Sequence, residues 1–564
     1  MELLSPVGGF EALYAAVSAG ADAVYLGGKD FSARQSAQNF DEADLARAIH
    51  YCQKRGVKAY ITINTLMSDR ELKELAPFLA LIYKEGADGV IVQDLGVSRL
   101  IHQQLSDLPI HGSTQMTIHT LEGAKALEQM GFSRVVLSRE LGLQQIKHIC
   151  ENCNIEVEVF AHGALCVSYS GQCLMSSMIG GRSGNRGRCA QPCRLQYQLE
   201  GKKGAMLSLK DLSLINHIKE LNDTGVDCLK IEGRMKGAEY ISVVTSVYRK
   251  AIDQKKVSKD DIKKLESVFY RGGYTDGYFT GKIAQDMYAV DKPDNPYLRQ
   301  TKYQLPLEKE PRFGERIRKD VIVQVPKINY KNRKKLTLTA QVTTIEQLQS
   351  VYQFGIMKVF VPAELIIQKA DLMDLTQVVC VMPRIGFHET QMKKVKELGV
   401  MGACASNIGQ IKPLIDMGFE VVGDFSLNIF NSQALLQAKE LGIKEATLST
   451  ELMLAQIRDI AKSIPTQVIA YGRLPLMLFE NPPKGKELID RKGVVFPLLG
   501  NELLNSCPIY MADKLEDMKE AGIREAKLLF TIESAKETEK VLKAYRKQVP
   551  FEGEFTRGKF YKGV

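Results

Sequence analysis

The 564-residue sequence lacks the features of a membrane or secreted protein. No stretch approaches the roughly 18 consecutive apolar residues that a membrane-spanning helix needs. The first ten residues, MELLSPVGGF, contain neither the basic segment nor the apolar run of a secretory signal. No long low-complexity tract interrupts a composition that is 45% hydrophobic and 25% charged. We therefore expect a globular cytoplasmic protein with no membrane partner.

The sequence also lacks the motifs of well-known proteases. Neither H-E-x-x-H nor G-x-S-x-G is present. The tight C-x2-C pairs of structural zinc sites are missing as well, apart from Cys150 with Cys153, which has no second pair nearby. In a reducing compartment, clustered thiols indicate metal binding or catalysis more often than disulfides. The net charge of +9 is compatible with a polyanionic partner but is weak evidence for one.

The length predicts two large domains rather than one. In the first half, β-rich runs alternate with amphipathic patterns such as that of residues 40–56, where Leu45, Ala48 and Ile49 share one face. This alternation predicts an α/β fold of the TIM-type (β/α)8 barrel class, with an open doubly wound sheet as the alternative. The predicted strands cover residues 1–6, 21–28, 58–64, 88–94, 109–115, 134–140, 156–163 and 228–234.

The second half repeats the first, weakly but in the same order. Three segments have counterparts, among them the endings LSREL and LSTEL. Where the first half has Cys166 and Cys173, the second has Pro475 and Pro482. We therefore predict a duplicated barrel whose degenerate second half lacks the chemistry of the first. The predicted domains are 1–284 for the first barrel, 285–335 for a linker or small insert, and 336–564 for the barrel-like repeat.

Four cysteines gather within 28 residues in the pattern C-x6-C-x15-C-x3-C: Cys166, Cys173, Cys189 and Cys193. They follow the seventh predicted strand, at the rim where TIM barrels carry their chemistry. The loose, glycine-bearing spacing favours a [4Fe–4S] cluster over a structural zinc ion, with unligated packed cysteines as a further alternative. Cys228, in the eighth strand, could replace Cys189 or Cys193 as a ligand, although a core side chain fits its position better.

Four arginines lie close in sequence to the last two of these cysteines. Arg182, Arg186, Arg188 and Arg194 are separated mainly by glycine, serine and asparagine. Guanidinium groups bind phosphates bidentately, and glycines let a loop follow a folded RNA. The pattern favours an RNA partner, with a solvated loop as the alternative.

The segment 158–176, EVFAHGALCVSYSGQCLMS, resembles the signature of the U32 peptidase family, also called collagenase-like. The opening MELLSPVGGFEALYAAVSAGADAVYLGG and the stretch KIEGRMK look like the same family, so the resemblance covers about residues 1–285. The stretch GGRSGNRGRCAQPCRLQY is more similar to members that hydroxylate a cytidine of 23S rRNA than to the shorter tRNA uridine hydroxylases.

This resemblance implies 5-hydroxylation of an RNA pyrimidine with prephenate as cosubstrate, and a [4Fe–4S] cluster on four cysteines. In one relative the fourth ligand lies well downstream, in a place that Cys228 could mimic. The two carboxylates of prephenate require cations, and Arg139, Arg234 and Lys236 follow strands at the expected rim.

Three further residues have candidate catalytic roles. Glu232 could position a proton or a hydroxyl group, and His162 could be an acid or base tuned near neutrality. Tyr169 could stack on a base turned out of the RNA. A satisfied structural histidine and a tyrosine packed beneath the cysteine loop are the alternatives for His162 and Tyr169.

The family resemblance, together with the cysteine pattern, implies an RNA-modifying hydroxylase that acts on a cytidine of 23S rRNA. The alternatives are tRNA uridine 5-hydroxylation, a U32-type peptidase, and an iron–sulfur accessory protein whose cluster is structural.

Overall fold

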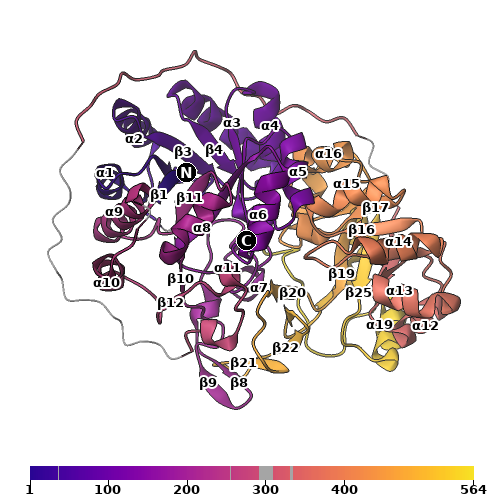
Figure 1. Cartoon of the computed structure of the whole chain (residues 1–564). Helices are drawn as coiled ribbons and strands as arrows, with labels where there is room; N and C mark the ends of the chain where they lie inside the picture. Colours follow the sequence, from indigo (N-terminus) through magenta and orange to yellow (C-terminus); the bar gives the residue numbers. More distant parts are fainter. Residues whose placement is uncertain (36, 255, 291–308, 331–334) are drawn as a thin grey trace.

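The computed structural model describes the chain except residues 36, 255, 291–308 and 331–334. Its first half is a closed barrel of eight parallel strands surrounded by helices (Figure 1). The strands are β1 (Glu2–Pro6), β2 (Ala23–Leu26), β3 (Lys58–Ile63), β4 (Gly89–Val92), β5 (Ile110–Gly112), β6 (Arg134–Val136), β7 (Glu156–Gly163) and β11 (Cys228–Ile231). Because β11 pairs with both β1 and β7, the sheet has no free edge. The predicted TIM-type barrel is confirmed, and the open doubly wound alternative is wrong.

The helices of this barrel begin and end where the local sequence supplies caps. Ser68 and Glu71 form a capping box at the start of α3, and Asp41 caps α2. The helices are α1 (Phe10–Ser18), α2 (Glu42–Lys54), α3 (Asp69–Lys84), α4 (Leu95–Gln104), α5 (Leu121–Gln129), α6 (Leu143–Asn152), α7 (Met175–Gly180), α8 (Ile218–Asp223), α9 (Ala238–Gln254), α10 (Lys259–Ser267) and α11 (Gly277–Thr280). Within the described residues, no helix combines the length and apolarity required to span a bilayer.

The second half is also a closed barrel of eight parallel strands. These are β13 (Thr337–Gln341), β14 (Val359–Pro362), β15 (Val378–Val381), β16 (Gly402–Ala405), β17 (Glu420–Gly423), β18 (Glu445–Thr447), β19 (Thr466–Gly472) and β25 (Glu525–Leu529). Helices around it include α12 (Ile345–Gln353), α13 (Ala363–Lys369), α14 (Glu389–Glu397), α15 (Ile408–Asp416), α16 (Ser432–Glu440), α17 (Leu454–Asp459), α18 (Leu515–Glu520) and α19 (Ala535–Lys547).

The two barrels share local details that support the duplication. The Tyr248 hydroxyl in α9 donates to the Ala161 carbonyl at 2.8 Å, and the Tyr545 hydroxyl in α19 donates to the Ala470 carbonyl at 2.7 Å. In each barrel the preceding strand, β7 or β19, ends in a glycine with positive φ, 105° at Gly163 and 124° in its counterpart. Both strands also carry a register shift against their parallel neighbour.

The barrels pack side by side through equivalent helices, α4 against α16 and α5 against α15. A Cβ atom added at Gly96 in α4 would lie 2.2 Å from Oδ1 of Asn431, the residue that caps α16. A Cβ atom at Gly409 in α15 would lie 2.8 Å from Oγ1 of Thr120, which caps α5. Each half therefore offers the other the same pair of surfaces, as the subunits of a two-fold dimer do.

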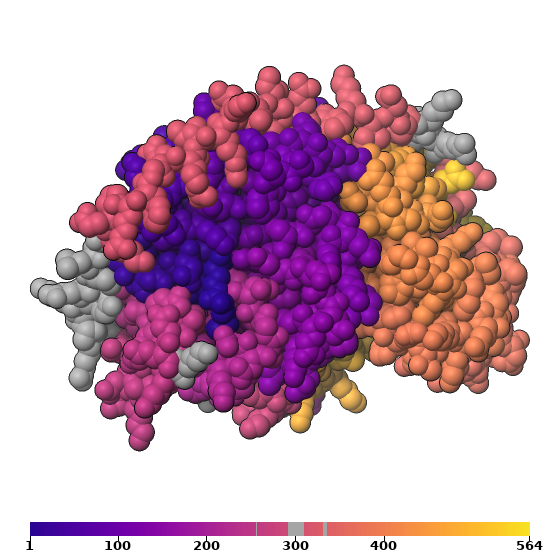
Figure 2. Space-filling model, turned by 45° about the horizontal axis from the view of Figure 1, so that its top comes forward, coloured from indigo at the N-terminus to yellow at the C-terminus, as the bar shows by residue number. Residues whose placement is uncertain are grey.

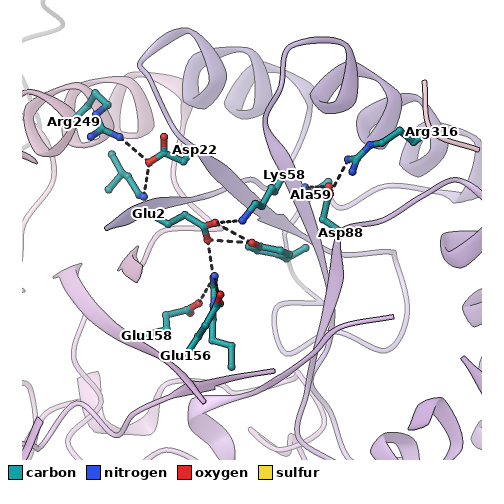
Figure 3. Close-up of polar contacts among 12 residues, drawn as sticks. Glu2, Asp22, Lys58, Ala59, Asp88, Glu156, Glu158, Arg249 and Arg316 are labelled. Atoms are coloured by element: carbon teal, nitrogen blue, oxygen red, sulfur yellow. Dashed lines mark hydrogen bonds and ion pairs between the residues drawn. The ribbon is translucent and has the colours of Figure 1, made fainter. Parts of the chain in front are cut away.

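Charged side chains fill the amino-terminal end of the first barrel (Figure 3). The Arg134 guanidinium donates to Glu2 at 2.7 Å and to Glu158 at 3.3 Å. Lys230 also donates to Glu158 at 2.8 Å. Lys58 adds a bond to Glu2 at 2.9 Å. Removing one partner of such a buried network typically costs about 3–5 kcal/mol. Ion pairs thus occupy this end of the barrel interior, opposite the carboxyl-terminal rim.

Residues 309–330, within the predicted linker, follow an extended path across the first barrel (Figure 2). The backbone amide of Arg312 donates to the Lys54 carbonyl at 2.7 Å, and that of Arg318 donates to the Lys84 carbonyl at 2.8 Å. The amide of Gln324 donates to Oε1 of Gln104 at 2.8 Å. This strap therefore runs past the ends of α2, α3 and α4. The rest of the predicted linker lies partly outside the described residues.

A third sheet joins the two halves. Its order is β20-β23-β22-β21-β8-β9, in which only β8 and β9 come from the first half. The strands are β8 (Tyr197–Leu199), β9 (Lys202–Gly204), β20 (Pro475–Leu478), β21 (Glu487–Asp490), β22 (Val495–Leu499) and β23 (Glu502–Leu504). We call this the composite sheet; β8, β9, β21 and β22 lie at the lower edge in Figure 1.

Candidate active site

The four clustered cysteines lie in one long excursion at the carboxyl-terminal rim of the first barrel. The excursion leaves at the end of β7 and returns with β10 (Asp211–Ser213), which runs antiparallel to β7. A Cβ atom at Gly163 would lie 2.6 Å from the Glu232 carbonyl oxygen, so only glycine fits where the chain leaves the strand. Both ends of the excursion are therefore fixed to the same strand.

A cavity of about 450 Å³ opens at this rim, and all four thiols line it. Its lining also contains cations from the barrel and from the excursion: Arg34, Arg139, Arg194, Lys230, Arg234, Lys236 and Arg271. Among the described residues that line the cavity, Glu232 is the only carboxylate. The cavity therefore combines soft sulfur donors with an excess of positive charge.

Burial keeps most of these thiols protonated near neutrality. Burial raises the pKa of Cys193 to about 11, and its sulfur neighbours add to the effect. The pKa of Cys173 is raised well above its ordinary value and that of Cys189 is raised, again mainly by burial and with contributions from the other thiols. A metal centre replaces such protons, because its positive charge stabilises thiolates.

The described residues contain no group of three or more histidine, cysteine, aspartate or glutamate side chains that could hold a metal ion. All four thiols line the same cavity, and the other three contribute to the raised pKa of Cys173. Four cysteine thiolates are the donor set of a [4Fe–4S] cluster, in which each iron takes one thiolate.

Glu232 is held by two arginines. Arg34 donates to one carboxylate oxygen at 3.3 Å and Arg139 to the other at 3.1 Å. Burial alone would raise the pKa of Glu232, but the two guanidinium groups outweigh it and lower the pKa below its ordinary value. Arg139 also donates to Oγ of Ser170 at 2.8 Å, which ties this ion pair to the loop between Cys166 and Cys173. Glu232 is therefore ionised and can accept a proton or a hydrogen bond.

The other predicted cations that line the cavity differ in freedom. Arg234 is 3% exposed and donates to Thr62 at 3.0 Å, with further bonds to Ser32 and Asn39. It thus braces the rim. Lys236 lies 3.0 Å from the Phe269 ring centroid, and burial lowers its pKa to about 8. Lys236 is the cation most able to lose its charge near neutrality.

Some predicted site residues lie elsewhere. His162 does not line the cavity; it is packed among tyrosines, with Tyr248 Oη 3.4 Å from Nδ1, and burial lowers its pKa to about 3. This placement fits a neutral structural histidine and does not support an acid or base role. Cys228 is fully buried inside the barrel and is not brought together with the other four cysteines.

The predicted RNA-binding arginines are not brought into the cavity, with the exception of Arg194. Arg182 and Arg188 are exposed, and Arg182 donates to the Arg188 carbonyl at 3.0 Å. Arg186 forms a two-bond ion pair with Glu71, which fixes it to the barrel. Tyr169 does line the cavity, but it is 3% exposed and its hydroxyl donates to Glu480 at 2.6 Å.

Sequence reasoning missed three lining cations, Arg34, Lys230 and Arg271. Lys230 alternates with apolar neighbours along β11, and an inward-facing lysine in a barrel strand was the available signal. Arg34 follows β2 in a polar loop and Arg271 lies beyond α10, where local sequence gives no indication of a site.

The second half supports the cysteine excursion directly. The amide of Tyr169 donates to the Leu478 carbonyl at 2.9 Å, and the amide of Leu174 donates to the Leu476 carbonyl at 2.7 Å. Both acceptors belong to β20, and its Met477 also lines the cavity. Glu451, fully buried in the second half, accepts a bond from Asn185 at 3.2 Å. The loop that bears the thiols is thus braced by the barrel that has none at those positions.

Comparison with known proteins shows similarity to one family. The model of peptidase family U32 matches residues 8–288. The 23S rRNA 5-hydroxycytidine C2501 synthase of Escherichia coli (strain K12) is 38% identical over 313 residues, which cover 52% of this chain and 47% of that protein.

Two further relatives carry different names. The tRNA hydroxylation protein P1 of Bacillus subtilis (strain 168) is 37% identical over 265 residues, 45% of this chain and 63% of that protein. A collagenase of Porphyromonas gingivalis (strain ATCC BAA-308 / W83) is 34% identical over 310 residues, 50% of this chain and 74% of that protein. The matched segment thus spans about half the length of the Escherichia coli relative and less than two thirds of the Bacillus subtilis one.

Proposed function

The chain belongs to peptidase family U32, and from this premise we propose that it is an enzyme that hydroxylates carbon 5 of a pyrimidine in RNA. The proposed substrate is a cytidine of 23S rRNA, in line with the name of the Escherichia coli relative, and a tRNA uridine is the nearest alternative. The reaction replaces the C5–H bond of the base with a C5–OH group, a two-electron oxidation that also requires an oxygen donor and a two-electron acceptor from outside the protein. The observation that carries the proposal is the cavity itself, where four thiols and seven cations surround one carboxylate.

In this proposal Cys166, Cys173, Cys189 and Cys193 hold a [4Fe–4S] cluster. When bound, the cluster supplies one-electron redox chemistry at the cavity wall. The raised pKa values of Cys173, Cys189 and Cys193 mean that cluster binding must displace protons, so cluster retention should weaken in acid. Zinc is the alternative occupant.

Prephenate is the proposed cosubstrate, and its two carboxylates need paired cations. Arg139 and Arg34 flank Glu232, while Lys236 and Arg271 line the same cavity. The arginines keep Glu232 ionised, so that it can accept a hydrogen bond from a substrate hydroxyl or amino group. Tyr169, tied to Glu480, forms part of the wall against which a base would lie.

Mass spectrometry of RNA nucleosides tests the activity. In a strain that lacks the gene, 5-hydroxycytidine should disappear from 23S rRNA and return when the wild-type gene is restored. The same complemented strain should lose the modification when it cannot make prephenate. Unchanged 5-hydroxycytidine in the deletion strain would remove the rRNA assignment, and loss of 5-hydroxyuridine from tRNA would move the activity to tRNA.

Analysis of anaerobically purified protein tests the cofactor. We expect about four irons and four sulfides per chain and an absorption band that bleaches on reduction. One zinc and no sulfide per chain would replace the cluster with the zinc alternative.

Peptidase activity is the second candidate, because one relative is named a collagenase and Cys166 is an exposed thiol. A cysteine nucleophile needs an adjacent base, whereas His162 contacts tyrosines and does not line the cavity. Hydrolysis of casein or gelatin by the pure protein, lost in Cys166→Ser, would restore this candidate.

A further inference from the structure

The composite sheet begins immediately beside the cysteine cavity. Tyr197 opens β8 only four residues after Cys193, and its hydroxyl donates to the Pro192 carbonyl at 2.9 Å. In the adjacent strand Asp490 pairs with Tyr197, which places the turn at Arg491 and Lys492 next to the cavity wall. The sheet therefore extends outward from the mouth of the site.

Both halves of the chain are needed to build this part of the sheet. The β8–β9 hairpin has strands of three residues each, too short to be stable alone. Strand β21 completes it by pairing Leu488 with Leu199 and Ile489 with Gln198. Leu199, Leu488 and Phe496 are buried, so one face of the sheet packs against the protein and the turns and outer face remain free.

The free parts of this sheet carry six exposed cations: Lys202, Lys203, Lys484, Lys486, Arg491 and Lys492. None of the six forms an ion pair with any residue that the structure describes. Three acids lie within the same segments, fewer than the six cations: Glu200 accepts from the Lys486 amide at 3.1 Å, Asp490 accepts from its own turn, and Glu487 is exposed. Elsewhere many exposed lysines and arginines have such partners, for example Lys54 with Glu315 and Arg249 with Asp22.

Three exposed apolar side chains lie on segments that also contribute lining residues to the cavity. Ile179 is 53% exposed, Leu195 is 45% exposed and Met235 is 52% exposed. Met235 lines the cavity, and Leu195 lies two residues beyond Cys193. Solvated cations beside exposed apolar groups at a cavity mouth match a ligand that offers phosphates along a backbone and a flat base to insert.

We propose that residues 195–204 and 484–499, here called the docking ribbon, bind the phosphate backbone of a folded RNA and direct one base into the cysteine cavity. This inference rests on the proposed function and adds the surface by which the substrate is held. The second half thereby contributes to substrate binding as well as to support of the cysteine loop. The cations recognise charge rather than sequence, so base selection belongs to the cavity.

The test compares two variants with the same reduction in positive charge. The ribbon variant is K202Q/K203Q/K486Q/R491Q/K492Q. The control is K369Q/K394Q/K439Q/K536Q/K547Q, which neutralises five exposed lysines on helices α13, α14, α16 and α19 of the second barrel. Fluorescence anisotropy with a transcribed fragment of 23S rRNA gives the dissociation constant at several salt concentrations, and a thermal melt checks that each variant is folded.

We expect the ribbon variant to bind at least tenfold more weakly, with the salt slope reduced by about 1 for each phosphate that the variant no longer neutralises. The control should stay within twofold of the wild type. Equal affinities for the two variants, or no RNA binding by the wild type, would overturn the proposal. The proposal would also be overturned if the ribbon variant kept its RNA affinity but lost binding to purified ribosomal proteins. The surface would then be a protein-binding surface.

Hydroxylation, measured in the same samples, separates this inference from the proposed function. If RNA binding depends on the ribbon but neither the wild type nor a variant hydroxylates a pyrimidine, the proposed activity is wrong and the docking surface stands. Full hydroxylation by the ribbon variant at unchanged affinity would remove the docking surface and leave the activity.

Discussion

The two barrels share one architecture but have diverged where each strand seven ends. In the first barrel the chain beyond Gly163 makes a long excursion with four cavity-lining thiols. In the second barrel the chain beyond Gly472 enters β20 and pairs with that excursion. One copy thus carries the candidate site, and the other supports the loop that bears its thiols. Two halves of one chain can therefore keep the same barrel while the loops at their rims diverge. In such barrels the loops, rather than the strands beneath them, build the sites.

Removal of one cavity thiol should have the largest effect, because only the first half carries the proposed cluster ligands. Cys193→Ser should lower bound iron by more than tenfold and abolish hydroxylation, because a serine hydroxyl is a poor iron ligand in a cluster of thiolates. Cys507→Ser, a half-buried cysteine of the second half, is the matched control and should keep both properties. Iron analysis and nucleoside mass spectrometry provide the measurements. Equal iron content in the two variants would contradict the assignment of the cluster to the first barrel.

Lys230 in β11 and Lys527 in β25 occupy equivalent inward-facing positions. Their replacement compares how much each lysine contributes to the free energy of unfolding. Lys230 lies 2.8 Å from fully buried Glu158, so Lys230→Met should lower the free energy of unfolding by about 3 kcal/mol. Lys527 lies 3.9 Å from Asp424 and makes no hydrogen bond with a described residue, so Lys527→Met should change it by less than about 1 kcal/mol. Urea titration of both variants measures the difference. Similar decreases would show that the two interiors are not energetically distinct.

Glu451 tests the support that the second barrel gives to the cysteine loop. Glu451→Ala removes the acceptor for Asn185 and leaves buried polar groups unpaired, which should cost about 2 kcal/mol and reduce iron retention. Glu451→Gln keeps an acceptor oxygen and should restore most of the iron. If the alanine variant retains full iron while losing stability, the contact is structural only.

The last comparison concerns Glu140, which aligns with Glu451 in the LSREL and LSTEL segments. Burial raises the pKa of Glu140 to about 7, with Glu480 adding to the shift and Arg139 opposing it. Because the folded pKa exceeds the unfolded value near 4.5, the folded state binds the proton more tightly. This contribution to stability is complete below about pH 4.5 and is lost as pH rises through about 7. Glu140→Gln should flatten the pH dependence of the unfolding free energy between about pH 5 and 7, and an unchanged slope would argue against this assignment.

The barrel was predictable because its signals are local. Each observed barrel strand of the first half falls within or beside a predicted run, and helix α2 buries the predicted face of Leu45, Ala48 and Ile49. The cysteine cluster was predictable because its members are close in sequence. Their gathering around one cavity follows from an excursion anchored at both ends on β7.

The rest depends on contacts that local sequence does not encode. The environment of His162 comes from Tyr240, Tyr248 and Tyr274, which lie far along the chain, so a histidine near four cysteines gave a misleading signal. The pairing of β8 with β21 joins segments from opposite halves of the chain. Arg34 reaches Glu232 only because strands two and eight meet at the same rim.

The close approach of the two barrels at Gly96 and Gly409 limits which residues can stand at these two positions. At each contact a single added methyl group would overlap a capping side chain of the opposite barrel. The first half has cysteines where the second has prolines, yet both halves have a glycine at the joint. A side chain at either glycine would therefore push the two barrels apart and shift β20, the strand of the second half that binds the cysteine excursion.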